Sequence, residues 1–179
     1  PQLCTGKGLW SFGLTEPEAG SDSRASKTTA ASEGNDWIIN GNKIFITNGS
    51  VDINIGTTVQ AVTGDPGGKK EFTTIIVEKG TPGFTQQVMH GKLMWRASDT
   101  SQLFFDDCRV SKENTLGKPG HGSKIMLQTL DAGRLSIAAM GLGCAQGAFD
   151  MALDYAQQRK QFGKALSKLQ AISFKLADM

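Results

Sequence analysis

Residues 37–49 read WIINGNKIFITNG, two short runs of aromatic and β-branched residues on either side of Asn40-Gly41. Such runs are typical of strands, and Asn-Gly is the dipeptide that a type I′ turn selects. This stretch therefore predicts a β-hairpin that turns at Asn40-Gly41, and with it a sheet whose neighbouring strands run antiparallel.

The sequence on both sides of this stretch has the same β-prone texture. Its runs are separated by Gly, Asn, Asp or Pro and no helical spacing lies between them, which favours a small antiparallel barrel or sandwich over a parallel sheet. These runs are LWSFGL (9–14), INIGTTVQAV (53–62), FTTIIVE (72–78) and QLFFDD (102–107).

The last third of the chain has a different pattern. After KPGHGS (118–123) the repeat of apolar residues changes from every second residue to one in roughly 3.6 residues. This change predicts a long helix or a broken pair of helices. Gly163 has the position of a residue that ends a helix, and Ser167 could cap the next one. We expect the domain boundary at the change of texture between Leu116 and Gly122.

Composition excludes several classes of protein. The chain has 179 residues, of which 39% are apolar and 20% charged, as is ordinary for a globular protein. The net charge of +2 indicates no nucleic-acid partner, and no apolar run reaches the length of about 18 residues that suggests a membrane span. Three scattered cysteines and two histidines favour a reducing compartment and no metal site.

The stretch FGLTEPEAGSD (12–22) follows the first predicted strand and carries polar side chains that could bind a ligand. Thr15, Ser21 and the backbone amides between them could surround a flat polar ligand or a phosphate with donors. The alternative is a capped junction between a strand and a loop, because Thr, Ser and Asp often form such local hydrogen bonds.

Longer motifs resemble those of the acyl-CoA dehydrogenases. GLTEPEAGSDSRA (13–25) fits the first signature of that family position by position. KIFITNG (43–49), LDAGRL (130–135) and RKQFGKALSKLQ (159–170) resemble further segments of the family in the same order. The resemblance covers essentially the whole chain. It implies a middle β domain over residues 1–118 and the beginning of a C-terminal helical bundle domain over residues 119–179.

The resemblance implies that FAD is the cofactor. Backbone groups of Leu14 and the hydroxyl of Thr15 would bind the pyrimidine edge of the flavin, and Thr47 would lie near its N5 atom. Within one subunit the implied FAD residues are Phe12, Leu14, Thr15, Gly20, Ser21, Phe45, Ile46 and Thr47. From a neighbouring subunit they are Arg159, Gln161, Phe162 and Gln170. This implies a homo-oligomer, as a dimer of dimers.

Several of these residues also have a purely structural interpretation. Phe45 could be an inward strand residue, and QQRKQF (157–162) could be a solvated helix end whose cations answer the helix dipole. Asp131 and Arg134 could form an ordinary intrahelical ion pair, although the resemblance places both, with Ser21, near the CoA part of the substrate. The three acids of the loop, Glu16, Glu18 and Asp22, have no catalytic role in this interpretation and are expected to be structural or solvated.

The resemblance implies α,β-desaturation of an acyl-CoA thioester, as in fatty acid β-oxidation, with electrons passed to an electron-transferring flavoprotein. Gly133 stands where some members carry their catalytic glutamate, so the base is expected beyond Met179. Because the chain starts at Pro1 and stops within a helical pattern, we expect a fragment. Because its catalytic base is expected beyond Met179, we expect this fragment to be inactive alone.

Overall likeness favours short-chain, butyryl-type members. The alternatives are an acyl-CoA oxidase that uses O2 and a non-enzymatic flavin-binding or scaffold protein. The expected location is the cytoplasm of a bacterium or the mitochondrial matrix of a eukaryote. One local departure from the family pattern is Met94 in KLMWRAS (92–98), at a position where the family usually has glycine.

Overall fold

The computed structural model describes residues 3–179, which fall into two compact units, Pro1–Gln128 and Thr129–Met179. The first unit consists mainly of strands and the second mainly of helices, in the expected order of a β domain followed by helices. No helix among residues 3–179 has the length and apolar character needed to cross a bilayer.

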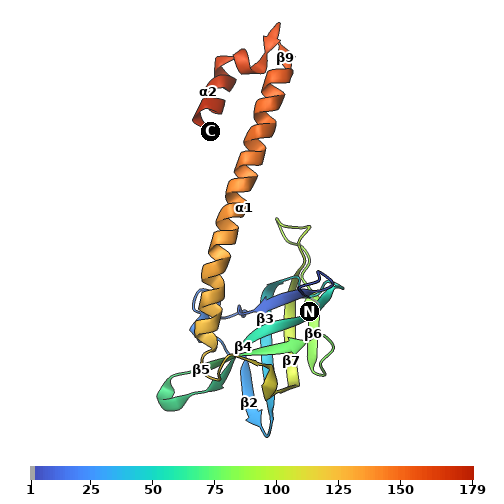
Figure 1. Ribbon diagram of the computed structural model, residues 1–179, viewed down its shortest axis with the longest axis vertical. Helices are drawn as coiled ribbons and strands as arrows, with labels where there is room; N and C mark the ends of the chain where they lie inside the picture. Colours follow the sequence, from blue (N-terminus) through green and yellow to red (C-terminus); the bar gives the residue numbers. More distant parts are fainter. Residues whose placement is uncertain (1–2) are drawn as a thin grey trace. The chain divides into compact units, whose positions relative to one another are not determined.

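The strands of the first unit form an eight-stranded sheet over the described residues, in the order β6-β7-β3-β2-β4-β5-β8, with β1 beside β4 (Figure 1). Most ladders are antiparallel, but β1 and β2 both run parallel to β4. The bounds are β1 Leu9–Gly13, β2 Thr29–Glu33, β3 Asp36–Thr47, β4 Asn54–Gly64, β5 Glu71–Glu78, β6 Phe84–Val88, β7 Thr100–Ser111 and β8 Thr115–Leu116. Short 3-10 turns occur at Ser23–Ala25, Pro66–Gly68 and Lys112–Asn114.

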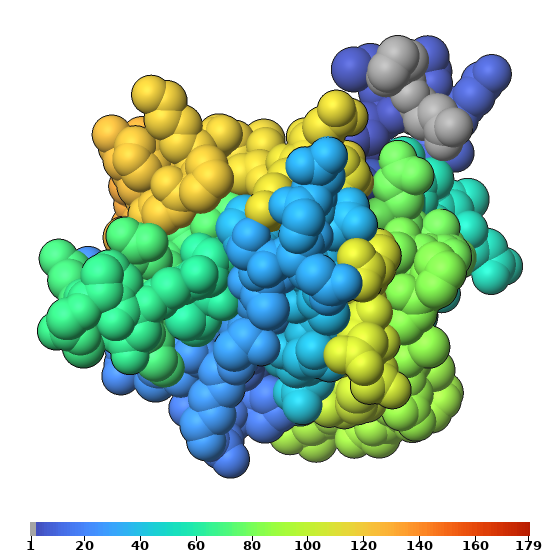
Figure 2. Space-filling model, turned by 90° about the horizontal axis from the view of Figure 1, so that it is seen from below, coloured from blue at the N-terminus to red at the C-terminus, as the bar shows by residue number. Residues whose placement is uncertain are grey.

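The hairpin predicted at Asn40-Gly41 is wrong, because β3 continues through these residues from Asp36 to Thr47. The chain turns instead at Gly34-Asn35, where β2 pairs with the start of β3. Gly34 has a φ of 55°, and glycine is favoured at the first central position of a type II′ turn. Figure 2 shows this β2–β3 hairpin in blue, between the β4–β5 loop in green and β7 in yellow.

Gly41 serves a bulge in β3 rather than a turn, since the register with β7 shifts between Ile39 and Gly41. The neighbouring Asn40 side chain bonds Asp107, donating to Oδ1 at 3.0 Å and accepting from its backbone N–H at 2.8 Å. A Cβ at Gly41 would lie 2.6 Å from Oγ1 of Thr28, and φ is 140°. A close approach between segments therefore requires this glycine.

The core of the first unit lies between its strands. In β3 and β7 buried residues alternate over part of the strand, as the period of two requires, whereas in β4 and β5 runs of consecutive residues are buried. The stacked rings of Phe84 and Phe105, with centroids 5.0 Å apart, belong to this core. Full burial of each large aliphatic side chain stabilises the fold by roughly 1.5–3 kcal/mol. The fully buried members include Ile39, Val59, Ala61, Ile75, Val77, Leu103 and Cys108.

The predicted long helix is a single helix, α1 (Gly122–Gln158), of which all but the first residues belong to the second unit. After it come β9 (Lys160–Gln161), β10 (Lys164–Ala165), the 3-10 turn Leu166–Lys168 and α2 (Gln170–Asp178).

Two local predictions in this region are wrong. Gly163 does not end a helix: with Phe162 it forms the turn of the β9–β10 hairpin, with φ values of 73° and 52°. A two-residue turn with positive φ at both positions is of type I′. Ser167 caps nothing, because it lies inside the 3-10 turn, and the N-cap position of α2 is Leu169 without a side-chain bond.

Candidate functional site

The motifs GLTEPEAGSDSRA (13–25) and KIFITNG (43–49) lie side by side in the first unit. The amide of Ile44 in β3 donates to the carbonyl of Thr15 at 2.9 Å, and the ammonium of Lys43 donates to the carbonyl of Leu14 at 3.2 Å. The residues just after β1 are therefore bonded to β3, one residue before Phe45. Phe12, within β1, is half-buried. The two segments with predicted flavin contacts are neighbours in space.

Thr15 has two hydrogen-bond donors that meet no acceptor within residues 3–179. Its carbonyl bonds Ile44, but neither its amide nor its hydroxyl has an acceptor within the described part of the chain. The residue is half-buried. Two donors held on one residue at a partly sheltered edge suit a ligand with hydrogen-bond acceptors along one side.

The segment of β3 beyond Lys43 contains a second bulge, where the register with β7 shifts between Lys43 and Ile46. Phe45 has a φ of 61°, a left-handed conformation that is unusual for a bulky residue, and its side chain is 62% exposed. The alternative of an inward strand residue is therefore wrong for Phe45. Ile46 is buried instead, with its carbonyl bonded by the hydroxyl of Ser101 at 3.0 Å.

The turn after β3 is held in place by hydrogen bonds to Asp99. Asp99 accepts from the amide of Ser50 at 3.0 Å and from its hydroxyl at 2.7 Å, and its backbone carbonyl accepts from the amide of Asn48 at 3.3 Å. Thr47, just before this turn, is exposed. Thr47 and Phe45 thus lie on a backbone that is fixed at both ends of the bulge.

The acidic loop after Thr15 has structural roles, as expected from the sequence. Glu18 pairs with Lys27 at the surface, and Asp22 accepts from the amide of Arg24 at 3.2 Å, which caps the 3-10 turn. Gly20 and Ser21 lie exposed at the outer part of this loop. The loop closes on itself through paired backbone bonds between Glu16 and Ala19, at 3.0 and 3.1 Å.

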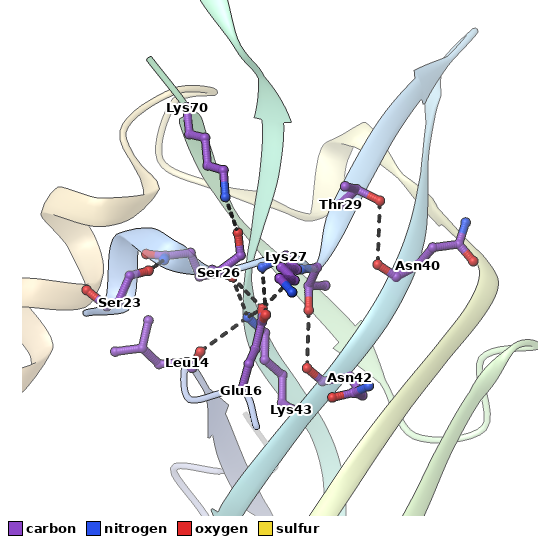
Figure 3. Close-up of polar contacts among 12 residues, drawn as sticks. Leu14, Glu16, Ser23, Ser26, Lys27, Thr29, Asn40, Asn42, Lys43 and Lys70 are labelled. Atoms are coloured by element: carbon purple, nitrogen blue, oxygen red, sulfur yellow. Dashed lines mark hydrogen bonds and ion pairs between the residues drawn. The ribbon is translucent and has the colours of Figure 1, made fainter. Parts of the chain in front are cut away.

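Glu16 is the buried member of these acids and forms an ion pair with Lys43, with 2.7 Å between Oε1 and Nζ. The Lys43 side chain is fully buried and that of Glu16 is 6% exposed. The carboxylate also accepts from the backbone amides of Lys27 at 2.6 Å and Thr28 at 3.1 Å, and from the hydroxyl of Ser26. Figure 3 shows Ser26 and Lys43 converging on this carboxylate, and the Leu14 carbonyl bonded to the Lys43 ammonium.

The pKa of Glu16 is set by two opposed effects. Burial raises it, but the hydrogen bond and charge of Lys43, with help from Ser26 and the amide of Lys27, lower the pKa to about 2. Burial also lowers the pKa of Lys43 by disfavouring its charge, while Glu16 opposes that change. We take both groups as charged at neutral pH, because the carboxylate has four donors and the ammonium three acceptors.

Lys43 was not among the residues selected from the sequence. The sequence nevertheless contained a sign of its burial. Lys43 is two residues from Gly41 and four from Ile39 in β3, so it lies on the same face of the strand as the buried residues. A lysine at an inward strand position requires a buried acid nearby. The sequence did not show which acid that would be.

The predicted FAD residues of the second unit gather on the β9–β10 hairpin and the start of α2. The carbonyl of Arg159 accepts from the amide of Leu166 at 2.9 Å, and Gln161 pairs across the ribbon with Lys164. Phe162, at the tip, has a φ of 52° and is 89% exposed. Gln170 is the exposed first residue of α2.

Asp131 and Arg134 form an exposed ion pair three residues apart on α1. This is the local alternative that the sequence left open, and such a pair contributes little to stability at a surface. The arrangement leaves both side chains on one face of the helix, accessible to a charged ligand.

The loop that contains Met94 is organised around Lys92. Its ammonium donates to the carbonyl of Trp95 and to the hydroxyl of Thr100, each at 2.8 Å, and to the carbonyl of Ser98. Met94 is 65% exposed, and the positive φ of the loop, 55°, falls on Trp95. The extra side chain at Met94 therefore points to solvent without disturbing the lysine's bonds.

Comparison with known families agrees with this arrangement. Residues 11–108 match the family model for the acyl-CoA dehydrogenase middle domain, and residues 120–179 match that for the acyl-CoA dehydrogenase C-terminal domain. The chain belongs to the acyl-CoA dehydrogenase family. Among residues 3–179 no group of three or more His, Cys, Asp or Glu side chains could hold a metal ion.

Individual relatives are similar over nearly the whole chain. The mitochondrial short-chain specific acyl-CoA dehydrogenase of Mus musculus is 49% identical over 168 residues, which cover 94% of this chain and 40% of the mouse protein. The solved structure of butyryl-CoA dehydrogenase from Megasphaera elsdenii superimposes with a TM-score of 0.91 at 45% identity, covering 99% of this chain and 46% of that one.

A chain from a structural study of the electron transferring flavoprotein of Acidaminococcus fermentans gives the same TM-score of 0.91 at 44% identity, again over 99% of this chain and 46% of the other. The chain thus spans less than half the length of these relatives.

Proposed function

We propose that this chain forms the flavin-facing part of an FAD-dependent acyl-CoA dehydrogenase that introduces an α,β double bond into a short-chain acyl-CoA. The proposal is carried by the juxtaposition of two groups. The donors of Thr15, which meet no acceptor within residues 3–179, lie beside the outward ring of Phe45, and the bond between Ile44 and Thr15 holds the two segments together. Similarity to short-chain and butyryl-CoA dehydrogenases supports the substrate class.

The residues present fit a flavin. An isoalloxazine ring is flat, apolar across its faces and polar along one edge. Phe45 offers a large exposed aromatic ring, while the amide and hydroxyl of Thr15 offer donors without protein acceptors in the described residues. The hydroxyl of Thr47, exposed on the same fixed segment, could add a further donor. An aromatic surface bordered by donors is what such a ring requires.

When bound, FAD would supply the hydride-accepting chemistry of the reaction. The chain's own residues would bind and orient it: Thr15 by donating to the pyrimidine edge, and Phe45 by shielding one edge from water. Leu14 would contribute backbone near the ring, although its carbonyl is already bonded by Lys43. Gly20 and Ser21 would lie toward phosphate groups, where the exposed loop leaves backbone and hydroxyl accessible.

The remote parts of the cofactor would be bound by the β9–β10 hairpin of a neighbouring subunit. Arg159 would bind the pyrophosphate through charge-assisted bonds and Phe162 would pack on the adenosine, with Gln161 and Gln170 adding hydrogen bonds. An aromatic side chain that is 89% exposed at the tip of a strained turn supports a contact of this kind for Phe162.

Assembly into a homo-oligomer is supported by the apolar surface of α1. A helix that is apolar around much of its circumference is normally buried against other helices. Large apolar side chains on α1 are exposed in the single chain, namely Leu127, Leu130, Leu135, Ile137, Met140, Leu142, Met151 and Tyr155. We propose packing against further helices of the bundle and of other subunits, in a dimer of dimers.

The acyl-CoA would be contacted by Ser21, Asp131 and Arg134, with the arginine suited to the phosphates of CoA. Glu16 is unsuitable as the base that removes the α-proton, because its pKa is about 2 and Lys43 occupies its carboxylate. A base works best with a pKa near the working pH. The electron acceptor that we propose is an electron-transferring flavoprotein.

The proposal is tested by replacing Arg159 with Ala in the purified full-length protein. We expect the FAD content after gel filtration to fall while the folded β unit, followed by circular dichroism, is retained. Unchanged FAD retention would sink the cross-subunit assignment. Turnover of butyryl-CoA with an artificial electron acceptor, without stoichiometric hydrogen peroxide in air, is expected of a dehydrogenase. Stoichiometric peroxide would assign an oxidase instead.

A further inference from the structure

The Glu16–Lys43 pair lies between the two segments that we propose to hold the flavin. Lys43 precedes the bulge of Phe45 by two residues, and Glu16 follows Thr15 directly. The ammonium distributes its three protons over Glu16 Oε1 at 2.7 Å, the Leu14 carbonyl at 3.2 Å and the Ser26 hydroxyl at 3.3 Å. Each proton has an acceptor, so the lysine is held in one place.

Stability alone does not explain such a pair. A buried ion pair often contributes no more to folding than apolar side chains of the same volume, because both charges lose their hydration. β1 is already joined to β4 by a parallel ladder, and Thr15 to β3 by the bond from Ile44. What Lys43 adds is a fixed direction for the carbonyl of Leu14.

That direction determines where a donor of the site points. In a planar trans peptide the C=O of one residue and the N–H of the next lie on opposite sides. Since the carbonyl of Leu14 is directed to Lys43, the amide of Thr15 is directed away from it. This amide is one of the donors without an acceptor in the described residues. The bond from Lys43 therefore directs the Thr15 amide away from the buried ammonium.

We propose that the Glu16–Lys43 pair is a positioning device for the flavin: it fixes the peptide between Leu14 and Thr15, so that the Thr15 amide is ready to donate to a flavin acceptor before the cofactor arrives. This inference rests on the proposed function, because it assumes that the ligand at Thr15 is FAD. Glu16 secures the ammonium, and Lys27 and Thr28 secure Glu16 through their backbone amides.

The test separates positioning from folding by comparing variants of the full-length protein. Lys43→Met leaves Glu16 buried without its partner and is expected to destabilise the protein. The double variant Glu16→Gln/Lys43→Met removes both charges, so it is expected to recover most of the stability. It still lacks the bond to the Leu14 carbonyl. Lys27→Met, which removes an exposed ion pair in the same loop, is the matched control.

We expect the double variant to bind FAD about tenfold more weakly than the unaltered protein, a factor that corresponds to about 1.4 kcal/mol. Its bound flavin should also have an altered long-wavelength absorption band, while Lys27→Met keeps the original affinity and spectrum. If the recovered double variant binds FAD with unchanged affinity and spectrum, the positioning role is wrong although the flavin site stands. If the unaltered protein binds no FAD, the proposed function itself fails.

A measurement on the unaltered protein covers the case in which the double variant does not fold. Hydrogen exchange of the Thr15 amide, followed with and without FAD, should slow on binding by about tenfold or more if the amide donates to the flavin. The amide of Gly34, in the hairpin turn of β2 and β3, serves as the reference and should not change. Equal exchange at Thr15 in both states would overturn the inference.

Discussion

Replacement of Lys43 by Met should destabilise the protein strongly and in a pH-dependent way. The substitution keeps most of the side-chain volume but leaves the Glu16 carboxylate, 6% exposed, without its counter-charge. Removing one member of a buried pair costs about 3–5 kcal/mol. The lowered pKa of Glu16 gives the same scale, since a shift from 4.5 to about 2 corresponds to about 3 kcal/mol at 1.36 kcal/mol per unit.

The sign of the pH dependence follows from the same pKa. In the unaltered protein Glu16 has a folded pKa below its unfolded value, so its contribution is present above pH 4.5 and is lost as the pH falls toward 2. In the variant, burial raises the pKa of Glu16, because no ammonium opposes it. The carboxylate then takes up a proton in mild acid. The difference in stability between the two proteins should therefore be largest at neutral pH. It should narrow as the pH falls through the raised pKa of the variant, above 4.5, and narrow further from pH 4.5 toward 2 as the unaltered protein loses its own contribution.

The assay is urea unfolding followed by circular dichroism, at several pH values between neutral and mildly acidic. Lys27→Met is the control and should unfold like the unaltered protein at every pH, because its ion pair with Glu18 is exposed. A Lys43→Met difference below about 1 kcal/mol, or one that stays constant across the pH range, would refute the account of a charged buried pair.

Three further outcomes are expected. Gly41→Ala should destabilise by about 2 kcal/mol or more in urea unfolding, because its Cβ would lie 2.6 Å from Thr28; a neutral result would contradict the close packing at the bulge. Phe162→Asn should raise the thermal midpoint, since Asn suits the positive φ of that turn, yet weaken FAD binding in titrations; unchanged FAD affinity would remove the adenosine contact. Native Cys108 should resist iodoacetamide at mildly alkaline pH, because burial raises its pKa to about 11, whereas exposed Cys4 reacts; rapid labelling of Cys108 would show that the core opens.

A matched control for Gly41 exists on α1. A Cβ at Gly133 would meet no atom within 4 Å, so Gly133→Ala should be neutral or stabilise by up to about 1 kcal/mol through helix propensity. The contrast between the two glycines distinguishes the effect of close packing from a general intolerance of substitution.

Local pattern was sufficient for the type of most elements and insufficient for their connections. The runs around Trp37, Val59 and Ile75 are strands as expected, because alternating β-branched residues suit a half-buried pleated surface. Asn40-Gly41 has the composition of a hairpin turn, but Thr28 and Asp107 hold it in a continuous strand. Contacts with distant segments overrode the turn preference, and a short window of sequence does not contain those contacts.

The sequence alone determined the family resemblance, the order of a β unit followed by helices, and which residues are candidates for FAD. Tertiary structure decided that Phe45 faces outward, since a bulge in β3 reverses the parity of its side chains. It also decided that Glu16 and Lys43, 27 residues apart in the chain, share one buried site. Alternation specifies which side a strand residue faces only while the ladder is regular, and a buried charge obtains its partner only when the chain has folded around it.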